Sequence, residues 1–179
     1  MKIIGIGGSL RPGSITYMAL ECAFRKARKH DIEGEIIDLR TLNLPFCVGG
    51  SDYVDYPDVQ RLRDLVRSAD GLILATPEYH GTLSGVLKNT LDLLRFEDME
   101  GKVCGMIGVL GGELSYNMMS TMRLICRQLH AWVVHREIII PYAEEAFDSH
   151  GELVNPKLDE RMTELVDSLV EGLKKFGKT

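Results

Sequence analysis

The arrangement of the whole chain can be read outward from the stretch Gly7-Gly8-Ser9-Leu10-Arg11-Pro12-Gly13-Ser14. The apolar run 2–6 before it predicts a buried strand, and segment 15–29 after it predicts a helix. A glycine-rich loop between a strand and a helix is typical of an anion site, because glycine lets the backbone approach closely and the first helical N–H groups are free. The two serines add hydroxyl donors, and Arg11 adds a guanidinium group suited to phosphate oxygens. The loop therefore predicts a phosphate site.

Two common nucleotide motifs do not fit this loop. The spacing from Gly8 to Ser14 nearly matches that of a nucleoside triphosphate loop, but Ser14 stands where that motif needs lysine. The dinucleotide fingerprint fails because Leu10 occupies the position of its third glycine. A plain strand–helix connection capped by Ser14 is the alternative to a phosphate site.

Length and composition predict one domain over residues 1–179, with 45% hydrophobic and 26% charged residues. The net charge of −5 disfavours nucleic acid and acidic membranes as partners. No apolar run is long enough for a membrane span, and the chain opens in a strand instead of a signal peptide, so we expect a cytoplasmic protein. The cysteines lack zinc or C-x-x-C spacing and the histidines are scattered, so we expect no metal site. Cys22, Cys104 and Cys126 fall in predicted helices or strands, where a reduced thiol behaves as a small apolar residue. Cys47 lies in a predicted loop, where a reactive thiol is the alternative.

Strands and helices alternate along the chain. Further strands are predicted at 35–39, 71–76, 102–109 and 132–140, and further helices at 59–66, 83–94, 118–129 and 156–176. Short apolar strands, each followed by a helix, indicate a parallel sheet covered on both faces, in the order 2-1-3-4-5 or a Rossmann-type order. In both orders ligands bind beyond the carboxyl ends of the strands, so we expect a site built from loops 7–14, 76–84 and 110–117.

The loop after the third strand can lie against a flat ligand. Pro77 fixes the exit of the chain, Tyr79 supplies a ring, and Gly81 lets backbone amides approach. His80 is open to two interpretations, an acid–base group or a hydrogen-bonding loop residue. Glu78 is equally open as a surface or subunit-contact carboxylate.

The loop after the fourth strand is rich in glycine as well. Its Gly111 and Gly112 offer backbone that can lie against a ring. None of the three loops holds a convincing set of nucleophile, base and acid. The loops therefore indicate ligand binding without supplying a protein catalytic group.

Three motifs follow one another at the ends of the expected strands: Gly8-Ser9-Leu10-Arg11 with Ser14, Thr76-Pro77-Glu78-Tyr79-His80-Gly81, and Gly85-Val86-Leu87-Lys88-Asn89 with Asp92. Together they resemble the NADPH-dependent FMN reductase family, and the resemblance extends through Gly111-Gly112 and Leu129-His130-Ala131. That family has the flavodoxin-like fold and includes quinone, azo-dye and chromate reductases. The resemblance implies a three-layer α/β fold with a five-stranded parallel sheet in the order 2-1-3-4-5 and helices on both faces.

The same resemblance implies FMN as the cofactor. The residues implied for its phosphate are Ser9, Arg11 and Ser14, with Thr16 at the start of the helix. The residues implied for its isoalloxazine ring are Pro77, Glu78, Tyr79, His80 and Gly81, with Gly111 and Gly112 nearby.

The implied activity is an NAD(P)H-dependent FMN reductase. Hydride passes from NADPH or NADH to flavin N5 and then to a small acceptor such as a quinone, an azo compound, a metal oxyanion or free flavin. This chemistry needs no catalytic side chain, which agrees with the absence of a catalytic set in the loops. The family also implies a homodimer or homotetramer.

The chain departs from the family pattern at several positions. Ser84 stands where the family commonly has proline, His80 where asparagine is frequent, and Leu93 where tryptophan is common; segment 113–117 also differs. Two alternatives from other classes stay open. One is a flavodoxin-type FMN electron carrier, and the other is a binding module for a phosphorylated metabolite without redox chemistry.

Overall fold

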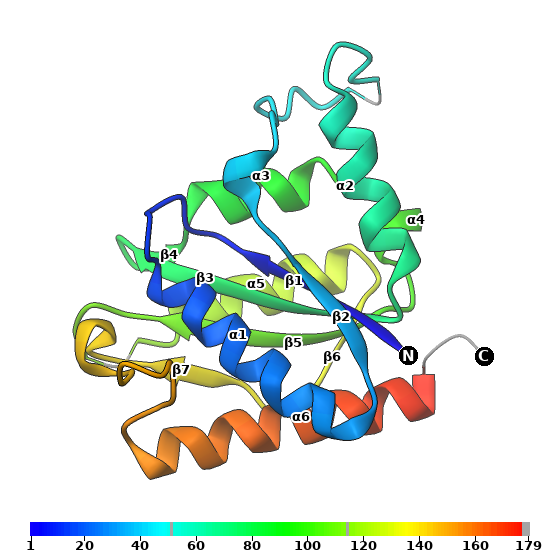
Figure 1. Ribbon diagram of the computed structural model, residues 1–179. Coiled ribbons are helices and arrows are strands. Elements are labelled where there is room, and N and C mark those ends of the chain that lie inside the picture. Colours follow the sequence, from blue (N-terminus) through cyan, green and yellow to red (C-terminus); the bar gives the residue numbers. More distant parts are fainter. Residues whose placement is uncertain (51, 114, 177–179) are drawn as a thin grey trace.

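The computed structural model describes residues 1–50, 52–113 and 115–176. Its strands and helices alternate as the sequence predicts (Figure 1). The strands are β1 (Lys2–Gly7), β2 (Glu33–Ile37), β3 (Gly71–Tyr79), β4 (Thr82–Leu83), β5 (Val103–Val109), β6 (Trp132–Val133) and β7 (Ile138–Ile140). The α-helices are α1 (Ile15–Ala27), α2 (Pro57–Ser68), α3 (Gly85–Asp92), α4 (Phe96–Met99), α5 (Asn117–Gln128) and α6 (Pro156–Phe176). Three short 3₁₀ helices are η1 (Arg28–His30), η2 (Leu39–Thr41) and η3 (Ala143–Glu145).

The main sheet is parallel and has the order β2-β1-β3-β5-β6, with β7 also paired to β5. Because β6 and β7 together occupy the fifth position, this is the predicted 2-1-3-4-5 order. The predicted count of five strands is wrong, since the sheet has seven strands among the residues that the structure describes. The additional strands come from the division of the predicted strand 132–140 and from β4, which pairs antiparallel with β3.

The fifth strand is divided because its register shifts. Cys104 pairs with Val133, but Ile107 pairs with Ile138, so four residues of one segment stand opposite two of its neighbour. Within this bulge Glu137 forms an ion pair with Arg123 of α5. An alternating apolar pattern does not reveal such an insertion, because the strands on both sides of it remain apolar.

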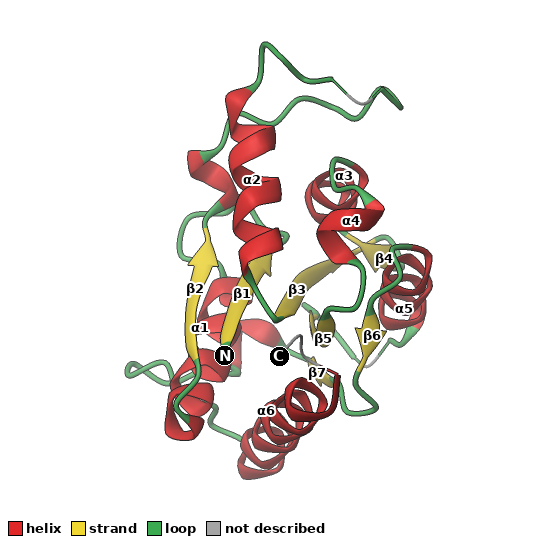
Figure 2. Cartoon of the chain, turned by 90° about the vertical axis from the view of Figure 1, so that its right-hand side faces the viewer, coloured by secondary structure: helices red, strands yellow, loops and turns green. Residues whose placement is uncertain are grey.

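Helices cover both faces of the sheet (Figure 2). Helices α1 and α6 pack on one face, and α2, α3 and α5 pack on the other. Side chains of the strands alternate between the two cores: Ile3 and Ile73 face the first, whereas Ile4 and Leu74 face the second. This burial on both sides explains why the strands read as continuous apolar runs.

Some predicted boundaries move by a few residues. The second strand begins at Glu33 instead of residue 35, and α3 begins at Gly85 instead of residue 83. Helix α4 and the 3₁₀ helices are absent from the sequence prediction. The thiols of Cys22, Cys104 and Cys126 are buried, and Cys47 is partly exposed. Within the described ranges, no helix has the length and apolar character that a membrane span requires.

Candidate functional site

A cavity of about 250 Å³ is lined by residues at or just beyond the ends of β1, β3 and β5. In Figure 1 these strands end on the left of the sheet. Most of the residues predicted for the site line it together: Ser9, Arg11, Ser14, Thr16, Pro77, Glu78, Tyr79 and Gly111. These residues come from three segments that are far apart in the sequence: the loop after β1 with the start of α1, the end of β3, and the loop after β5. The expectation that the three loops meet at one edge of the sheet is therefore confirmed.

The loop after β1 can receive a phosphate group. Ser14 is the N-cap of α1 and accepts a hydrogen bond from the amide of Thr16 at 3.2 Å. The hydroxyl of Ser9 accepts from the amide of Arg11 at 3.3 Å. Both serines are buried, and each hydroxyl keeps its own proton for donation. Among the described residues, none accepts a hydrogen bond from the amides of Gly13, Ser14 and Ile15. This helix start thus combines free N–H groups with a favourable dipole.

The loop after β1 is fastened to the start of α3. The Gly8 amide donates to the Ala75 carbonyl at 2.8 Å, and the Ser84 hydroxyl donates to the Gly8 carbonyl at 2.6 Å. The same hydroxyl caps α3 by accepting from the Leu87 amide at 3.2 Å. A Cβ atom on Gly8 would lie 2.6 Å from this hydroxyl oxygen, so only glycine fits. Ser84, which departs from the family pattern, therefore joins two loops of the site.

The segment after β3 is a hairpin and not an open loop. Tyr79 pairs with Thr82 across the turn His80-Gly81, and both turn residues have positive φ, 51° and 87°. Positive φ at both central positions is the geometry of a type I′ turn. The turn holds His80 and Gly81 at the tip of the hairpin, and the cavity wall does not include them or Gly112. Their predicted contact with a ligand stays a prediction.

Glu78 and Gly111 leave space and hydrogen-bonding capacity for a ligand. The Oε2 atom of Glu78 is buried and has no hydrogen-bond partner in the described part of the chain. A buried polar atom of this kind calls for a donor. The pyrimidine N–H and the ribityl hydroxyls of a flavin are such donors. A Cβ atom on Gly111 would meet nothing within 4 Å, so the backbone there is open to a flat ring. The cavity therefore offers an acceptor for a ligand N–H or O–H group and open backbone beside which a flat ring can lie.

Sequence reasoning missed one wall of the cavity. Ala143 and Glu144 of η3 line it, and Glu144 Oε1 lies 2.7 Å from Arg11 Nη1. Segment 141–145 follows β7, so it leaves the sheet at the same edge as the other loops. The rule that ligands bind beyond the carboxyl ends of strands extends to this segment and is the signal that could have found it.

Tyr17 was missed as well; it is not part of the cavity wall, but its hydroxyl contacts the ends of β1 and β2, next to the loop that is. Its hydroxyl accepts from the amide of Leu39 at 3.1 Å and lies 3.2 Å from the carbonyl oxygen of Gly7. Burial raises the pKa of this phenol above its ordinary value of 10.0. The tyrosine links α1 to the ends of β1 and β2.

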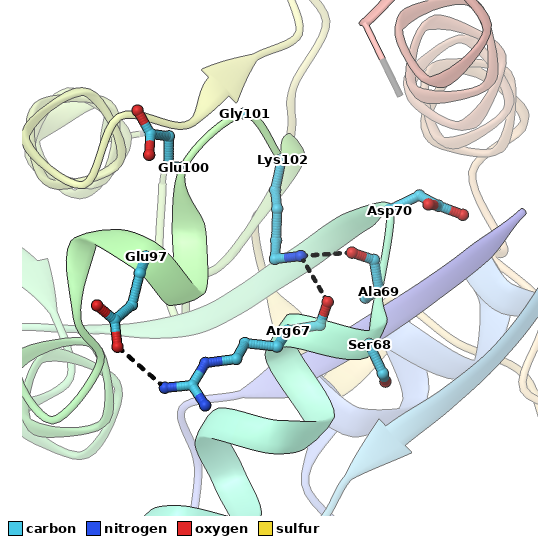
Figure 3. Close-up of a pocket in the computed structure, with 8 residues that line it drawn as sticks. All are labelled: Arg67, Ser68, Ala69, Asp70, Glu97, Glu100, Gly101 and Lys102. Carbon is cyan, nitrogen blue, oxygen red and sulfur yellow. Dashed lines mark hydrogen bonds and ion pairs between the residues drawn. The ribbon is translucent and has the colours of Figure 1, made fainter. Parts of the chain in front are cut away.

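A second cavity lies at the opposite edge of the sheet, between the end of α2 and the start of β5 (Figure 3). There Lys102 Nζ donates to the carbonyl oxygens of Arg67 and Ala69 at the end of α2. Arg67 itself pairs with Glu97 at 3.2 Å. These contacts satisfy a helix C-terminus, so the polar groups of this cavity serve the fold.

One group of potential metal ligands occurs in the described residues. The ligand atoms of Cys22, Glu152 and Asp159 lie within 4.8 Å of one another. Glu152 already pairs with Arg25 at 3.0 Å, and Asp159 pairs with Lys26 at 2.7 Å. Because both carboxylates are neutralised by cations, we assign no metal to this group.

Comparison with known proteins identifies the family. Residues 1–145 match the family model described as NADPH-dependent FMN reductase. The FMN-dependent NADPH-azoreductase of Staphylococcus aureus is 35% identical over 155 residues, which are 84% of this chain and 82% of that protein. The NADPH azoreductase of Bacillus sp. (strain OY1-2) is 30% identical over 166 residues, covering 92% of this chain and 90% of that protein.

Solved structures share the fold. FerB, a flavoenzyme NAD(P)H:(acceptor) oxidoreductase from Paracoccus denitrificans, has a TM-score of 0.76 at 20% identity and covers 99% of each chain. A flavodoxin from the domain Archaea has a TM-score of 0.67 at 12% identity, covering 97% of this chain and 99% of that one. The flavodoxin-like fold and the family resemblance are thus both confirmed. The chain is an FMN-dependent NAD(P)H oxidoreductase and belongs to the NADPH-dependent FMN reductase family.

Proposed function

We propose that the cavity at the ends of β1, β3 and β5 is the FMN site. The single observation that carries the proposal is the start of α1, where two buried serine hydroxyls border the cavity and the amides of Ser14 and Ile15 have no acceptor among the described residues. The phosphate is assigned to Ser9, Arg11, Ser14 and Thr16. The ring is assigned to Pro77, Glu78, Tyr79 and Gly111, with His80, Gly81 and Gly112 beside it.

The chemistry supplied at this site by bound FMN is two-electron transfer from NAD(P)H to a small acceptor. The chain itself binds the cofactor and orients it. The amides and hydroxyls of loop 7–14 hold the phosphate, and the Glu78 carboxylate accepts a hydrogen bond from the ligand. No side chain has to act as a nucleophile, because no covalent bond to the protein forms.

We propose that the acceptor is an azo compound, a quinone, a metal oxyanion or free flavin. The names of the two azoreductase relatives support the azo compound, and the structural neighbour named as an NAD(P)H:(acceptor) oxidoreductase supports a small acceptor in general. NADPH and NADH both stay candidates as donor. We further propose one domain over residues 1–179, a homodimer or homotetramer, and a cytoplasmic location without nucleic acid or membrane partners, which the net charge of −5 supports.

Anaerobic stopped-flow spectroscopy of FMN-loaded protein mixed with NADPH, and separately with NADH, tests the proposal. We expect the oxidised flavin band to bleach rapidly, and the faster donor identifies the co-substrate. Bound FMN that neither donor bleaches would favour the electron carrier instead. A protein that FMN cannot turn yellow would favour the non-redox module.

A further inference from the structure

Arg11, which we assign to the phosphate, already has a carboxylate partner in the structure. Glu144 Oε1 lies 2.7 Å from Arg11 Nη1, and the two side chains are 68% and 67% exposed. Both residues line the cavity that also contains the buried hydroxyls of Ser9 and Ser14. A negative charge therefore stands at the same wall as the groups suited to a phosphate.

The backbone holds Glu144 at this wall independently of Arg11. The Leu110 amide donates to the Ile140 carbonyl at 2.9 Å, the Tyr142 amide to the Gly112 carbonyl at 3.2 Å, and the Ala143 amide to the Leu110 carbonyl at 2.9 Å. These bonds tie the segment that carries Glu144 to the loop after β5. If Arg11 turns toward another anion, Glu144 consequently stays beside the cavity.

We propose that Glu144 sets how strongly this site prefers a phosphorylated flavin over one without phosphate. The inference rests on the proposed FMN site. A phosphate group carries close to two negative charges at neutral pH and binds arginine through two oxygens. It competes with Glu144 for Arg11 and is repelled by the carboxylate that remains nearby. Riboflavin has no phosphate, so Glu144 does not affect its binding in this way.

The direction of the effect separates this role from a structural one. If Glu144 acts against the phosphate, removal of its charge tightens FMN binding. If Glu144 instead holds Arg11 in the orientation that the phosphate needs, removal of the charge weakens FMN binding. The two roles therefore predict changes of opposite sign.

The experiment compares Glu144→Gln with the unaltered protein by titration of FMN and of riboflavin, followed by flavin fluorescence at low and high salt. Glutamine keeps the size of the side chain, and the position is exposed, so the variant should fold. Glu145→Gln is the matched control, because Glu145 lies in the same 3₁₀ helix, is exposed, and is not part of the cavity wall.

In Glu144→Gln we expect the Kd of FMN to fall about two- to fivefold at low salt, the range typical of exposed charge pairs. The Kd of riboflavin should stay constant, the gain should shrink as salt screens the charges, and Glu145→Gln should give a smaller change. An unchanged ratio of the two Kd values, or weaker FMN binding, overturns the role of Glu144 and leaves the FMN site intact. If the unaltered protein binds neither flavin, the FMN site itself is wrong.

Discussion

At the scale of single residues, Tyr17 connects three parts of the fold through one hydroxyl. Besides the amide of Leu39 and the carbonyl of Gly7, its oxygen lies 3.4 Å from the carbonyl of Ile37. The tyrosine thus joins α1 to the ends of two neighbouring strands. Sequence alone marks it only as a helical residue, because its partners are distant in the chain.

We expect Tyr17→Phe to lower the free energy of unfolding by about 1–2 kcal/mol, since the amide of Leu39 loses its acceptor in a partly buried place. Urea denaturation at pH 7 measures this change. Tyr116→Phe is the control, because the Tyr116 side chain is exposed. Equal losses in the two variants would contradict the role given to the Tyr17 hydroxyl.

The difference in unfolding free energy between the unaltered protein and Tyr17→Phe should also depend on pH. Burial raises the pKa of Tyr17 in the folded state above its ordinary value of 10.0, so the neutral phenol stabilises the fold. That contribution is complete below pH 10.0 and is lost as the pH rises through the folded pKa. The difference in unfolding free energy between the two proteins should therefore be constant from neutral pH to about pH 9 and fall at higher pH.

At the scale of elements, the start of α3 is bonded to loop 7–14, which we propose holds the phosphate. Ser84 is fully buried at 0% exposure, caps the helix and donates to the carbonyl of Gly8. Its own amide donates to the hydroxyl of Thr76 at 3.0 Å. A proline, which the family commonly has here, could not make that bond because it lacks the N–H group.

We expect Ser84→Ala to destabilise the protein by about 1–3 kcal/mol, because it removes a helix cap and leaves the buried carbonyl of Gly8 without its donor. Urea denaturation measures the loss, and FMN titration should show weaker binding as the loop becomes free to move. Ser120→Ala in α5 is the control, since the Ser120 hydroxyl is exposed and returns to its own helix. Wild-type stability and FMN affinity in Ser84→Ala would refute the connection.

The hairpin after β3 shows where prediction of elements fails. The sequence predicts a strand that stops at residue 76, yet the strand continues to Tyr79 and returns through β4. From the sequence, Pro77 is expected to fix the exit of the chain from the strand. In the structure Pro77 instead lies within β3, opposite Val109 of β5, and residues 78 and 79 go on to pair with residues 83 and 82 of β4.

At the scale of the whole molecule, two apolar cores on one sheet bring separate loops to a common edge. At the edge where the strands have their carboxyl ends, Glu78 Oε2 has no hydrogen-bond partner among the described residues. At the opposite edge, Lys102 donates to carbonyl oxygens at the end of α2, and Arg67 pairs with Glu97 and Asp98 (Figure 3). The polar groups named here at the opposite edge are thus occupied by contacts within the protein, whereas Glu78 keeps an acceptor for a ligand.

FMN should stabilise the whole fold by mass action. At a concentration one hundred times its Kd, we expect FMN to add about 2.7 kcal/mol and to raise the melting temperature by roughly 5–10 °C in a chain of this size. Thermal denaturation followed by circular dichroism, with and without FMN, measures the shift. Removal of FMN by dialysis should reverse it.

The variant Arg11→Ala tests whether this stabilisation depends on the phosphate contact. At the same FMN concentration its melting temperature should rise less than that of the unaltered protein, because a charge-assisted contact is lost. An equal rise would show that Arg11 does not hold the phosphate. Riboflavin should stabilise both proteins to the same extent.

Local patterns in the sequence determined the alternation of strands and helices and, through the family resemblance, the order of the sheet and the use of FMN. They also support our proposal that the loop around Ser9 and Ser14 holds the phosphate. These features depend on residues close together in the chain or on whole motifs. Only the tertiary structure decided which side chains meet. Ser84 bonds to Gly8 across 76 positions, and Glu144 pairs with Arg11 across 133 positions. Such contacts depend on how complete helices and strands pack against one another, so the residue pattern of a short segment cannot predict them.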